Sequence, residues 1–326
     1  MGDRMDVVKP LLYILVFPGF LFQFVFSTYL EWMDRKFYAR MQNRRGPLYT
    51  GYAGLLQPVA DILKLFFKED IVPARADRFM FSLMPILGLA AVVTAGLYLP
   101  VWLFTPYNSF EGDLIVVLYL LSLPSLVLFL AGWFSVSPYS LIGATRVLTQ
   151  LFAYEVPFFL ALLTPAVVAG SWQIRTIAVY PWTSGSWWVI GIQLLAFLVA
   201  LLTLQAKLER VPFDIPEAET EVVGGPLTEY SGKKLAMFRI QKDILMLVGS
   251  AFIAALFLGG FPGGLWIGGL WLLVKTSIVV FLLSVIRASF ARIRIDQIVT
   301  FSWKYLAPAS LVQLLVVLIL KGNGVL

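Results

Sequence analysis

Cysteine and histidine are both absent from this sequence of 326 residues. Without cysteine the chain can form no disulfide and offers no thiolate to a substrate or an iron–sulfur cluster. Without histidine it lacks the commonest general base and the usual haem and zinc ligand. No metal-ligand spacing, nucleophile–base pair or glycine-rich phosphate loop appears either. We therefore expect no catalytic residue, metal or cofactor on this chain.

Charged residues are also scarce. They make up 13% of the chain, whereas hydrophobic residues make up 60%. A soluble domain carries roughly 25% charged residues, so a chain this apolar could not cover its surface in water. The composition predicts an integral membrane protein in contact with lipid. The net charge of +6 then matters through its placement, and we expect no nucleic-acid partner.

Eight apolar runs are long enough to cross a bilayer as helices, which takes roughly 20 residues each. They are 10–30, 79–103, 114–134, 147–170, 186–206, 236–258, 265–286 and 303–320. The first run is not typical of a cleaved signal peptide, because acids and bases are mixed before it and it lacks a small-residue cleavage site. We predict an all-α, polytopic fold of about eight transmembrane helices, with residues 1–326 as a single integral membrane domain.

The basic residues indicate an orientation. Most of the 25 lysines and arginines fall in segments 31–78, 135–149, 207–242 and 287–304, whereas the opposite side holds Arg4, Lys9, Arg175 and Lys321. Cytoplasmic loops of membrane proteins carry the excess of Lys and Arg. We therefore expect a multi-pass protein of the cell membrane with both termini outside and with two long cytoplasmic loops, 31–78 and 207–235.

Residues 54–68 of the first long loop predict an amphipathic helix. Leu55, Val59, Ile62 and Phe66 recur with helical spacing, and polar residues occupy the other face. The stretch is too short to span a bilayer, so it is expected to lie along the membrane interface. It could be a lipid anchor, a lid over a cavity or a docking floor for a soluble partner. The basic run before it could bind lipid headgroups or an acidic protein surface.

The second long loop is rich in carboxylates, broken by prolines and glycines at Pro212, Pro216 and 224–226. These carboxylates are Glu209, Asp214, Glu217, Glu219, Glu221 and Glu229. Close carboxylates repel one another when ionised, so some should have a raised pKa and could hold a proton. The loop could be a proton relay, or simply a solvated acidic segment.

Two ionisable residues lie inside predicted spans. They are Glu155 in the fourth span and Lys275 in the seventh. Such residues are costly in hydrocarbon and are candidates for function. Pro157, just after Glu155, could open the helix to water. Arg146, nearby, could pair with a carboxylate of the second loop. Lys275 could equally pair with an acid of a neighbouring subunit.

Several stretches resemble one known family, subunit 1 of the respiratory NADH dehydrogenase (complex I) with its bacterial counterparts, and its relatives in membrane-bound energy-converting hydrogenases. They are EWMDRKFYARMQNRRGP from 31, GLLQPVADILKLFFKE from 54, RVLTQLFAYE from 146, ERVPFDIPEAETEVVGG from 209, EYSG from 229, RASFARIRIDQ from 287 and FSWK from 301. The resemblance implies eight spans and a position between a soluble redox arm and antiporter-like pumping subunits.

The resemblance also implies roles for particular residues. Glu155, Asp214, Glu217, Glu219 and Glu221 look like an acidic funnel that relays protons, and Lys275 joins them as a buried candidate. The soluble arm would dock on one set from the first long loop and another from the family's charged loop near 290. This docking set is Arg35, Arg40, Arg44, Arg45, Arg287, Arg292, Arg294 and Asp296.

One departure from the respiratory pattern affects the function expected. After EYSG the respiratory subunits usually continue to Ala-Glu-Tyr, whereas Lys242 and Asp243 occupy the Glu-Tyr positions here. This favours the ferredoxin-fed relatives, of hydrogenase or sulfane sulfur reductase type, over a quinone chamber. The partners would then be hydrogenase-like large and small iron–sulfur subunits, which carry the clusters and the catalytic metal. The cysteine-free, basic and aliphatic chain would suit an archaeal thermophile.

Two alternatives remain open. The first is the quinone-chamber subunit of a complex I-like dehydrogenase that oxidises NADH or a reduced deazaflavin. The second is a stand-alone ion-coupled transporter, for which a repeat of two halves would be expected. No internal repeat is evident in the sequence.

Overall fold

The computed structural model describes residues 12–100, 109–184 and 188–323, and these form helices joined by loops, with no strand among them. Seven of the helices described are long and apolar enough to cross a membrane, and a shorter apolar helix, α9 (Leu194–Lys207), accompanies them. The prediction of an all-α polytopic membrane protein is confirmed. The start of the first predicted span and the end of the second lie outside the described residues.

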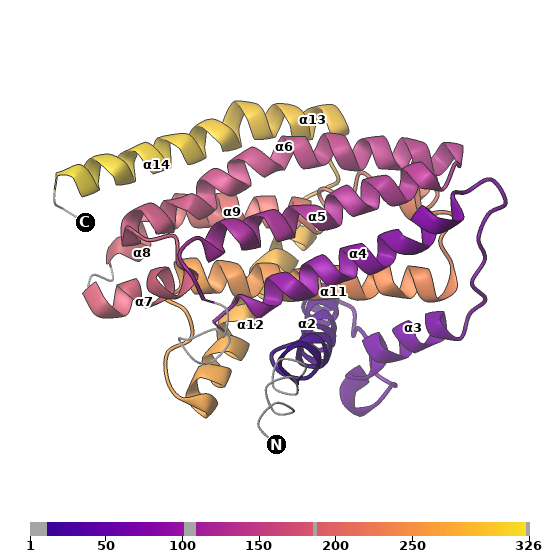
Figure 1. Cartoon of the computed structure of the whole chain (residues 1–326), viewed down its shortest axis with the longest axis horizontal. Coiled ribbons are helices and arrows are strands. Elements are labelled where there is room, and N and C mark those ends of the chain that lie inside the picture. Colours follow the sequence, from indigo (N-terminus) through magenta and orange to yellow (C-terminus); the bar gives the residue numbers. More distant parts are fainter. Residues whose placement is uncertain (1–11, 101–108, 185–187, 324–326) are drawn as a thin grey trace, which may run out of the picture.

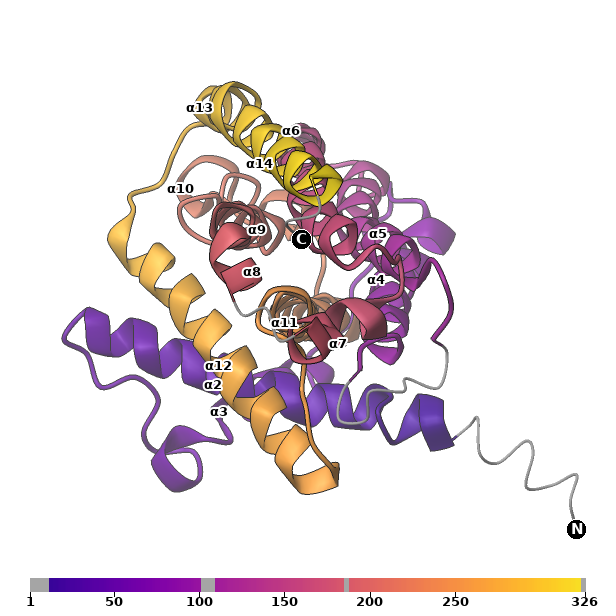
Figure 2. The same ribbon diagram turned by 90° about the vertical axis from the view of Figure 1, so that its left-hand side faces the viewer.

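Helix α11 (Gly232–Phe257) is the centre of the bundle. Figure 2 shows it end on, with α4 (Arg78–Leu97), α5 (Asp113–Phe134), α6 (Pro138–Ala169), α9 and α12 (Leu265–Ser289) around it. Small residues let its neighbours approach closely, as is usual in membranes, where lipid removes the hydrophobic drive between helices. At Gly249 an added Cβ would lie 2.5 Å from the Leu204 side chain of α9.

Helix α2 (Phe20–Met41) crosses α11 instead of running along it, as Figures 1 and 2 show together. It continues well past the predicted end of the first span, because no proline or glycine interrupts the sequence before Gly46. Arg35 and Arg40, expected in the first long loop, are therefore on this helix. The loop proper holds the turn η1 (Tyr52–Gly54) and α3 (Gln57–Phe66), which packs against α2 and α11 within the predicted interfacial segment.

The fifth predicted span is two helices. The short α8 (Trp188–Ile192) is separated from α9 by Gln193. After α9 the second long loop folds into compact turns, α10 (Glu219–Val222) and η2 (Gly225–Leu227). This loop lies directly on α6, since a Cβ at Gly143 would come within 2.6 Å of the Gly225 backbone. Glycine at position 143 thus brings the acidic loop against the bundle.

The remaining elements complete the two sides of the bundle. They are α7 (Ile174–Ser184), α13 (Ile295–Phe301), the π-helical turn η3 (Ser302–Leu306) and α14 (Ala307–Gly322). Figure 1 shows α13 and α14 along α6, at the top of the view. The segment between α12 and α13 lies against the second loop, where Ile293 N–H donates to the Pro212 carbonyl at 3.2 Å. Charged segments far apart in sequence thus meet where α9 ends and α11 begins.

Candidate functional site: a buried charge network

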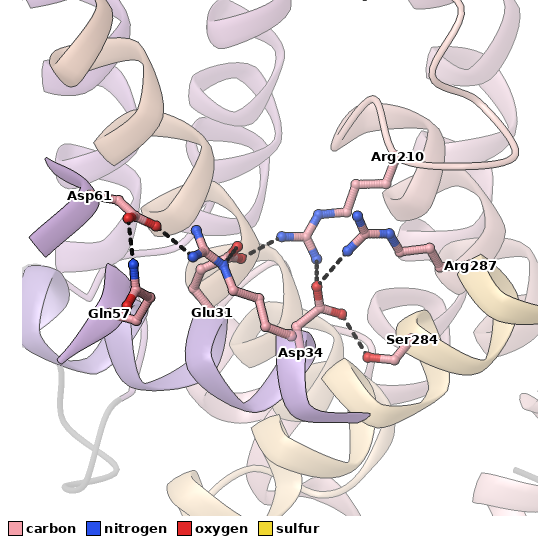
Figure 3. A network of polar contacts seen from close by, with 8 residues as sticks. Glu31, Asp34, Gln57, Asp61, Arg210, Ser284 and Arg287 are labelled. Atoms are coloured by element: carbon pink, nitrogen blue, oxygen red, sulfur yellow. Dashed lines mark hydrogen bonds and ion pairs between the residues drawn. The ribbon is translucent and has the colours of Figure 1, made fainter. Parts of the chain in front are cut away.

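Two acids of α2 lie in the interior of the protein. Glu31 is 9% exposed and Asp34 is fully buried. Their spacing of three residues puts both on one face of the helix. Arg210 from the second loop contacts each of them, with N···O distances of 2.7 Å to Glu31 and 3.0 Å to Asp34. Figure 3 shows Arg210 reaching both carboxylates.

Asp34 also receives groups from α12. Arg287 lies 2.9 Å from one carboxylate oxygen, and the Ser284 hydroxyl donates to the other at 2.6 Å (Figure 3). A buried carboxylate needs this many partners, because an unpaired charge in the interior costs several kcal/mol. Asp34 therefore ties α2, α12 and the second loop together.

Arg35 extends the network to α3. Its guanidinium is 2.9 Å from Glu31 and 2.6 Å from Asp61, and the Gln57 amide donates to Asp61 at 2.8 Å. The interfacial helix is thereby held by charge as well as by packing. Arg35 and Arg287, both expected to dock a soluble arm, are committed to pairs inside the chain.

A charged cavity of about 460 Å³ opens beside this network. Its lining combines acids and bases from α2, the second loop, α11 and α12. These are Glu31, Glu209, Arg210, Asp214, Glu217, Arg239, Lys242, Asp243, Arg287 and Arg292. Lys242 bridges two of the acids, 2.8 Å from Glu209 and 2.6 Å from Glu217. The cavity thus alternates carboxylates and cations.

Burial and neighbouring charge set the acid strengths of the loop groups in opposite directions. Burial raises the pKa of Glu209, although Lys242 opposes it. Burial acts in the same sense on Glu217, but the attraction of Lys242 and its hydrogen bond prevail and lower the pKa of Glu217. Desolvation acts to lower the pKa of Arg210, but the charges of Asp34 and Glu31 outweigh it and raise that pKa. Glu209 is therefore the loop acid best suited to hold a proton.

A second group of charges joins the loop to α6. The Arg146 guanidinium is 2.6 Å from Glu221, as the sequence suggested, and this hydrogen bond lowers the pKa of Glu221. Arg292 lies 3.4 Å from Asp214 and 3.6 Å from Glu221. Glu217 and Glu221, expected on one helix face, have different partners because α10 begins only after Glu217.

Glu155 is paired inside the membrane-spanning bundle. Its carboxylate accepts from the Ser122 hydroxyl and lies 3.2 Å from the ammonium of Lys207, whose side chain is fully buried. Lys207 also donates to the Leu121 carbonyl at 3.1 Å. On its other side Glu155 borders a groove of about 630 Å³ between α5 and α6, lined by apolar side chains apart from Ser122 and Glu155.

The other predicted residues lie apart from these groups. Lys275 donates to the carbonyls of Leu258 and Gly260, both at 2.6 Å, at the end of α11. Glu219 begins α10, and its side chain lies outside the described part of the chain. Five residues of the docking set are at the surface: Arg40, Arg44, Arg45, Arg294 and Asp296 are exposed. Across the described ranges no cluster of acids has the arrangement of a metal site.

The sequence analysis did not identify Glu31, Asp34, Asp61 and Lys207 as site residues. Glu31 and Asp34 stand just after the predicted first span, which ends at residue 30, and their spacing of three was the available signal. Lys207 ends an apolar run, where the charge pattern assigns it to the cytoplasmic loop. Its burial depends on α5 and α6, which its own sequence neighbourhood does not reveal.

Comparisons with known proteins agree with the resemblance seen in the sequence. The family model described as NADH dehydrogenase matches residues 13–318. The chain is 41% identical to NADH-quinone oxidoreductase subunit 8 of Thermus thermophilus, over 93% of this chain and 84% of the relative. It is 36% identical to an NADH-quinone oxidoreductase subunit of Geobacter sulfurreducens, over 97% of each.

These two relatives are bacterial, and their names mention neither a hydrogenase nor a sulfane sulfur reductase. The archaeal source and the hydrogenase-type complex therefore stay predictions. The match over nearly the whole chain, together with the apolar helices, shows a multi-pass membrane protein of an oxidoreductase complex. The chain belongs to the NADH dehydrogenase (complex I subunit 1) family.

Proposed function

We propose that this chain is the non-redox membrane subunit that anchors a soluble electron-transfer arm and relays coupling to antiporter-like subunits. The observation that supports this most strongly is the row of alternating acids and bases at the cavity. It begins with Glu31 and Asp34, passes Arg210 and continues through Lys242 to Glu209. Such a row can exchange partners or protons in response to a charge that arrives at the cavity.

Docking of the arm is assigned to the exposed members of the basic set. Arg40, Arg44 and Arg45 follow one another where α2 ends, and Arg294 lies beside α13. Arginine at a surface of this kind suits an acidic protein partner, because charge complementarity guides and orients association. Arg35 and Arg287 would instead hold the floor of the cavity beneath that surface.

The electron donor is proposed to be ferredoxin, with hydrogenase-like large and small subunits in the arm. Lys242 supports this, because its ammonium sits between Glu209 and Glu217 in a cavity lined mainly by charged residues. A quinone head group would have to enter that ion-paired space and displace its charges. The second candidate, a quinone-chamber subunit, is favoured by the names of the relatives, which are subunits of NADH-quinone oxidoreductases.

Purification of the intact complex through a tag on this chain, followed by reconstitution in liposomes, tests the proposal. We expect iron–sulfur and antiporter-like subunits to co-purify, and reduced ferredoxin to drive ion translocation. NADH oxidation with quinone reduction, blocked by quinone-site inhibitors, would favour the second candidate. Ion uptake by the chain alone would contradict both and indicate a transporter.

The proposed orientation has both termini outside and the two long loops in the cytoplasm. Because the chain contains no cysteine, single cysteines can report on it directly. Lys68→Cys, in the first loop, is expected to react with a membrane-impermeant maleimide only from the cytoplasmic side. Gly264→Cys, in an exposed turn before α12, is expected to react only from outside. The reverse pattern would contradict the orientation.

A further inference from the structure

Lys207 is the least exposed cation of the charge groups described above. Its residue is 2% exposed and its side chain is fully buried. The rings of Tyr154 and Phe158 lie 5.3 Å and 4.9 Å from its ammonium, so aromatic faces cover the parts that Glu155 and the Leu121 carbonyl do not. An ammonium in such surroundings is costly unless its partner stays charged.

Glu155 in turn has Lys207 as its single cationic partner among the residues described. The Ser122 hydroxyl donates to its other oxygen, and the rest of its surroundings are the apolar groove between α5 and α6. A carboxyl group in such a site is ionised only while a cation lies next to it. The charge of Glu155 is thus tied to one side chain.

The pair is also connected to the charged cavity. Tyr154, next to Glu155 in sequence, lies within electrostatic reach of both Glu155 and Glu209. Its hydroxyl shares a hydrogen bond of 2.8 Å with Ser125. Glu209 itself follows Lys207 by two residues and is paired with Lys242 in the cavity. A change of charge at Glu209 is therefore felt at the pair.

We propose that Lys207 is a positioning residue that holds Glu155 ionised at the mouth of the groove, so that the pair forms the outlet of the relay toward a neighbouring membrane subunit. This inference rests on the proposed function. While Lys207 contacts Glu155, the carboxylate stays charged. When Lys207 moves toward the cavity side, Glu155 becomes the stronger base and takes up a proton at its carboxylate oxygen.

The test compares Lys207→Met and Glu155→Gln, alone and combined, in the intact complex in sealed membrane vesicles. Ions translocated per electron and the electron-transfer rate are measured together. We expect Lys207→Met to lower translocation per electron about tenfold or more, because Glu155 becomes neutral without its cation. Redox-induced infrared difference spectra of Lys207→Met should gain the carbonyl stretch of a protonated carboxylic acid, and the double variant should lack it.

A matched control is Lys234→Met. Lys234 pairs with Asp70 at 2.8 Å, but Asp70 lies at the exposed end of the first long loop and remains hydrated. This variant should keep its coupling and show no new carbonyl band. The double variant, in which neither charge is left unpaired, should assemble at normal levels even if Lys207→Met does not. Its infrared spectrum then still reports on Glu155 by comparison with Glu155→Gln.

The outcomes separate the inference from the proposed function. Normal coupling in Lys207→Met with lost coupling in Glu155→Gln would overturn the role of Lys207 and leave the relay intact. Normal coupling in both variants would overturn the relay as well. A protonated-acid band in the double variant as strong as in Lys207→Met would assign the band to another carboxyl and also overturn the inference.

Discussion

The network around Asp34 and the pair at Glu155 treat buried charge in different ways. Asp34 is contacted by two arginines and a serine drawn from the second loop and α12. Glu155 has one lysine and one serine, and it borders an apolar groove. Loss of one contact at Asp34 leaves others in place, whereas loss of Lys207 leaves Glu155 without a counter-charge. The first arrangement is suited to holding helices together and the second to changing state.

The largest effect is expected from Asp34→Asn. This change leaves Arg210 and Arg287 buried with one fewer negative charge, and removal of one partner from a buried ion pair typically costs about 3–5 kcal/mol. The amount of this chain assembled in membranes and its thermal unfolding in detergent should both fall sharply. Asp61→Asn is the control, because Asp61 is 39% exposed in its pair with Arg35 and should cost less than about 1 kcal/mol. Equal effects would remove the distinction between the two kinds of site.

Glu155→Gln should have the opposite profile. The amide keeps the shape of the side chain and still accepts from Ser122, so assembly should stay near normal. Ion translocation per electron should fall severalfold or more, since the amide cannot take up a proton. Measurement of both quantities on one vesicle preparation decides the matter. A strong loss of assembly with normal coupling would place Glu155 in the same class as Asp34.

The docking surface should give an intermediate effect. Replacing Arg44 and Arg45 together by glutamate reverses exposed charge without touching either buried group. We expect the ratio of soluble arm to membrane subunits after purification to fall severalfold, and more at low salt, where surface charges are less screened. Arg175→Glu, exposed in α7 on the predicted outer side, is the control. An unchanged ratio at every salt concentration would argue against docking there.

The smallest effect is expected from Arg146→Met, which removes the partner of the exposed Glu221. Because Arg146 lowers the pKa of Glu221, the pair stabilises the protein above the ordinary glutamate pKa of about 4.3. That contribution disappears as the pH falls through the lowered pKa. Wild type and variant should differ by less than about 1 kcal/mol in stability at pH 7, and their thermal midpoints should converge in acid. A gap that widens in acid would mean that Arg146 acts elsewhere.

The sequence was sufficient for the fold class because long apolar runs and the charges within them can be recognised locally. Glu155 and the pairing of Arg146 with the second loop were likewise foreseeable, the first as a charge inside an apolar run. The partner of Glu155 was not, because Lys207 approaches it only after α5, α6 and α9 have packed. Helix α9 is also shorter than the predicted fifth span, since a break at Gln193 separates it from α8.

The charged cavity was predictable only in its parts. The acids of the second loop were evident, but Arg210, Lys242 and Arg292 separate them in space, and cations lower the pKa of some instead of leaving it raised. Repulsion among neighbouring carboxylates, judged from sequence spacing alone, therefore overstates their basicity. The roles of these residues stay predictions, since geometry alone does not assign them.

Helix α6 has a mechanical consequence. Its 32 residues carry Arg146, which grips the second loop, and Glu155, which lies nine residues further on, about 13 Å along the axis and on the opposite face. No proline interrupts the helix between them, and the first one after Glu155 is Pro157, where a backbone hydrogen bond is missing. The stretch behaves as a stiff rod with its hinge just past the carboxylate, so a push on the loop reaches Glu155 before the helix can bend.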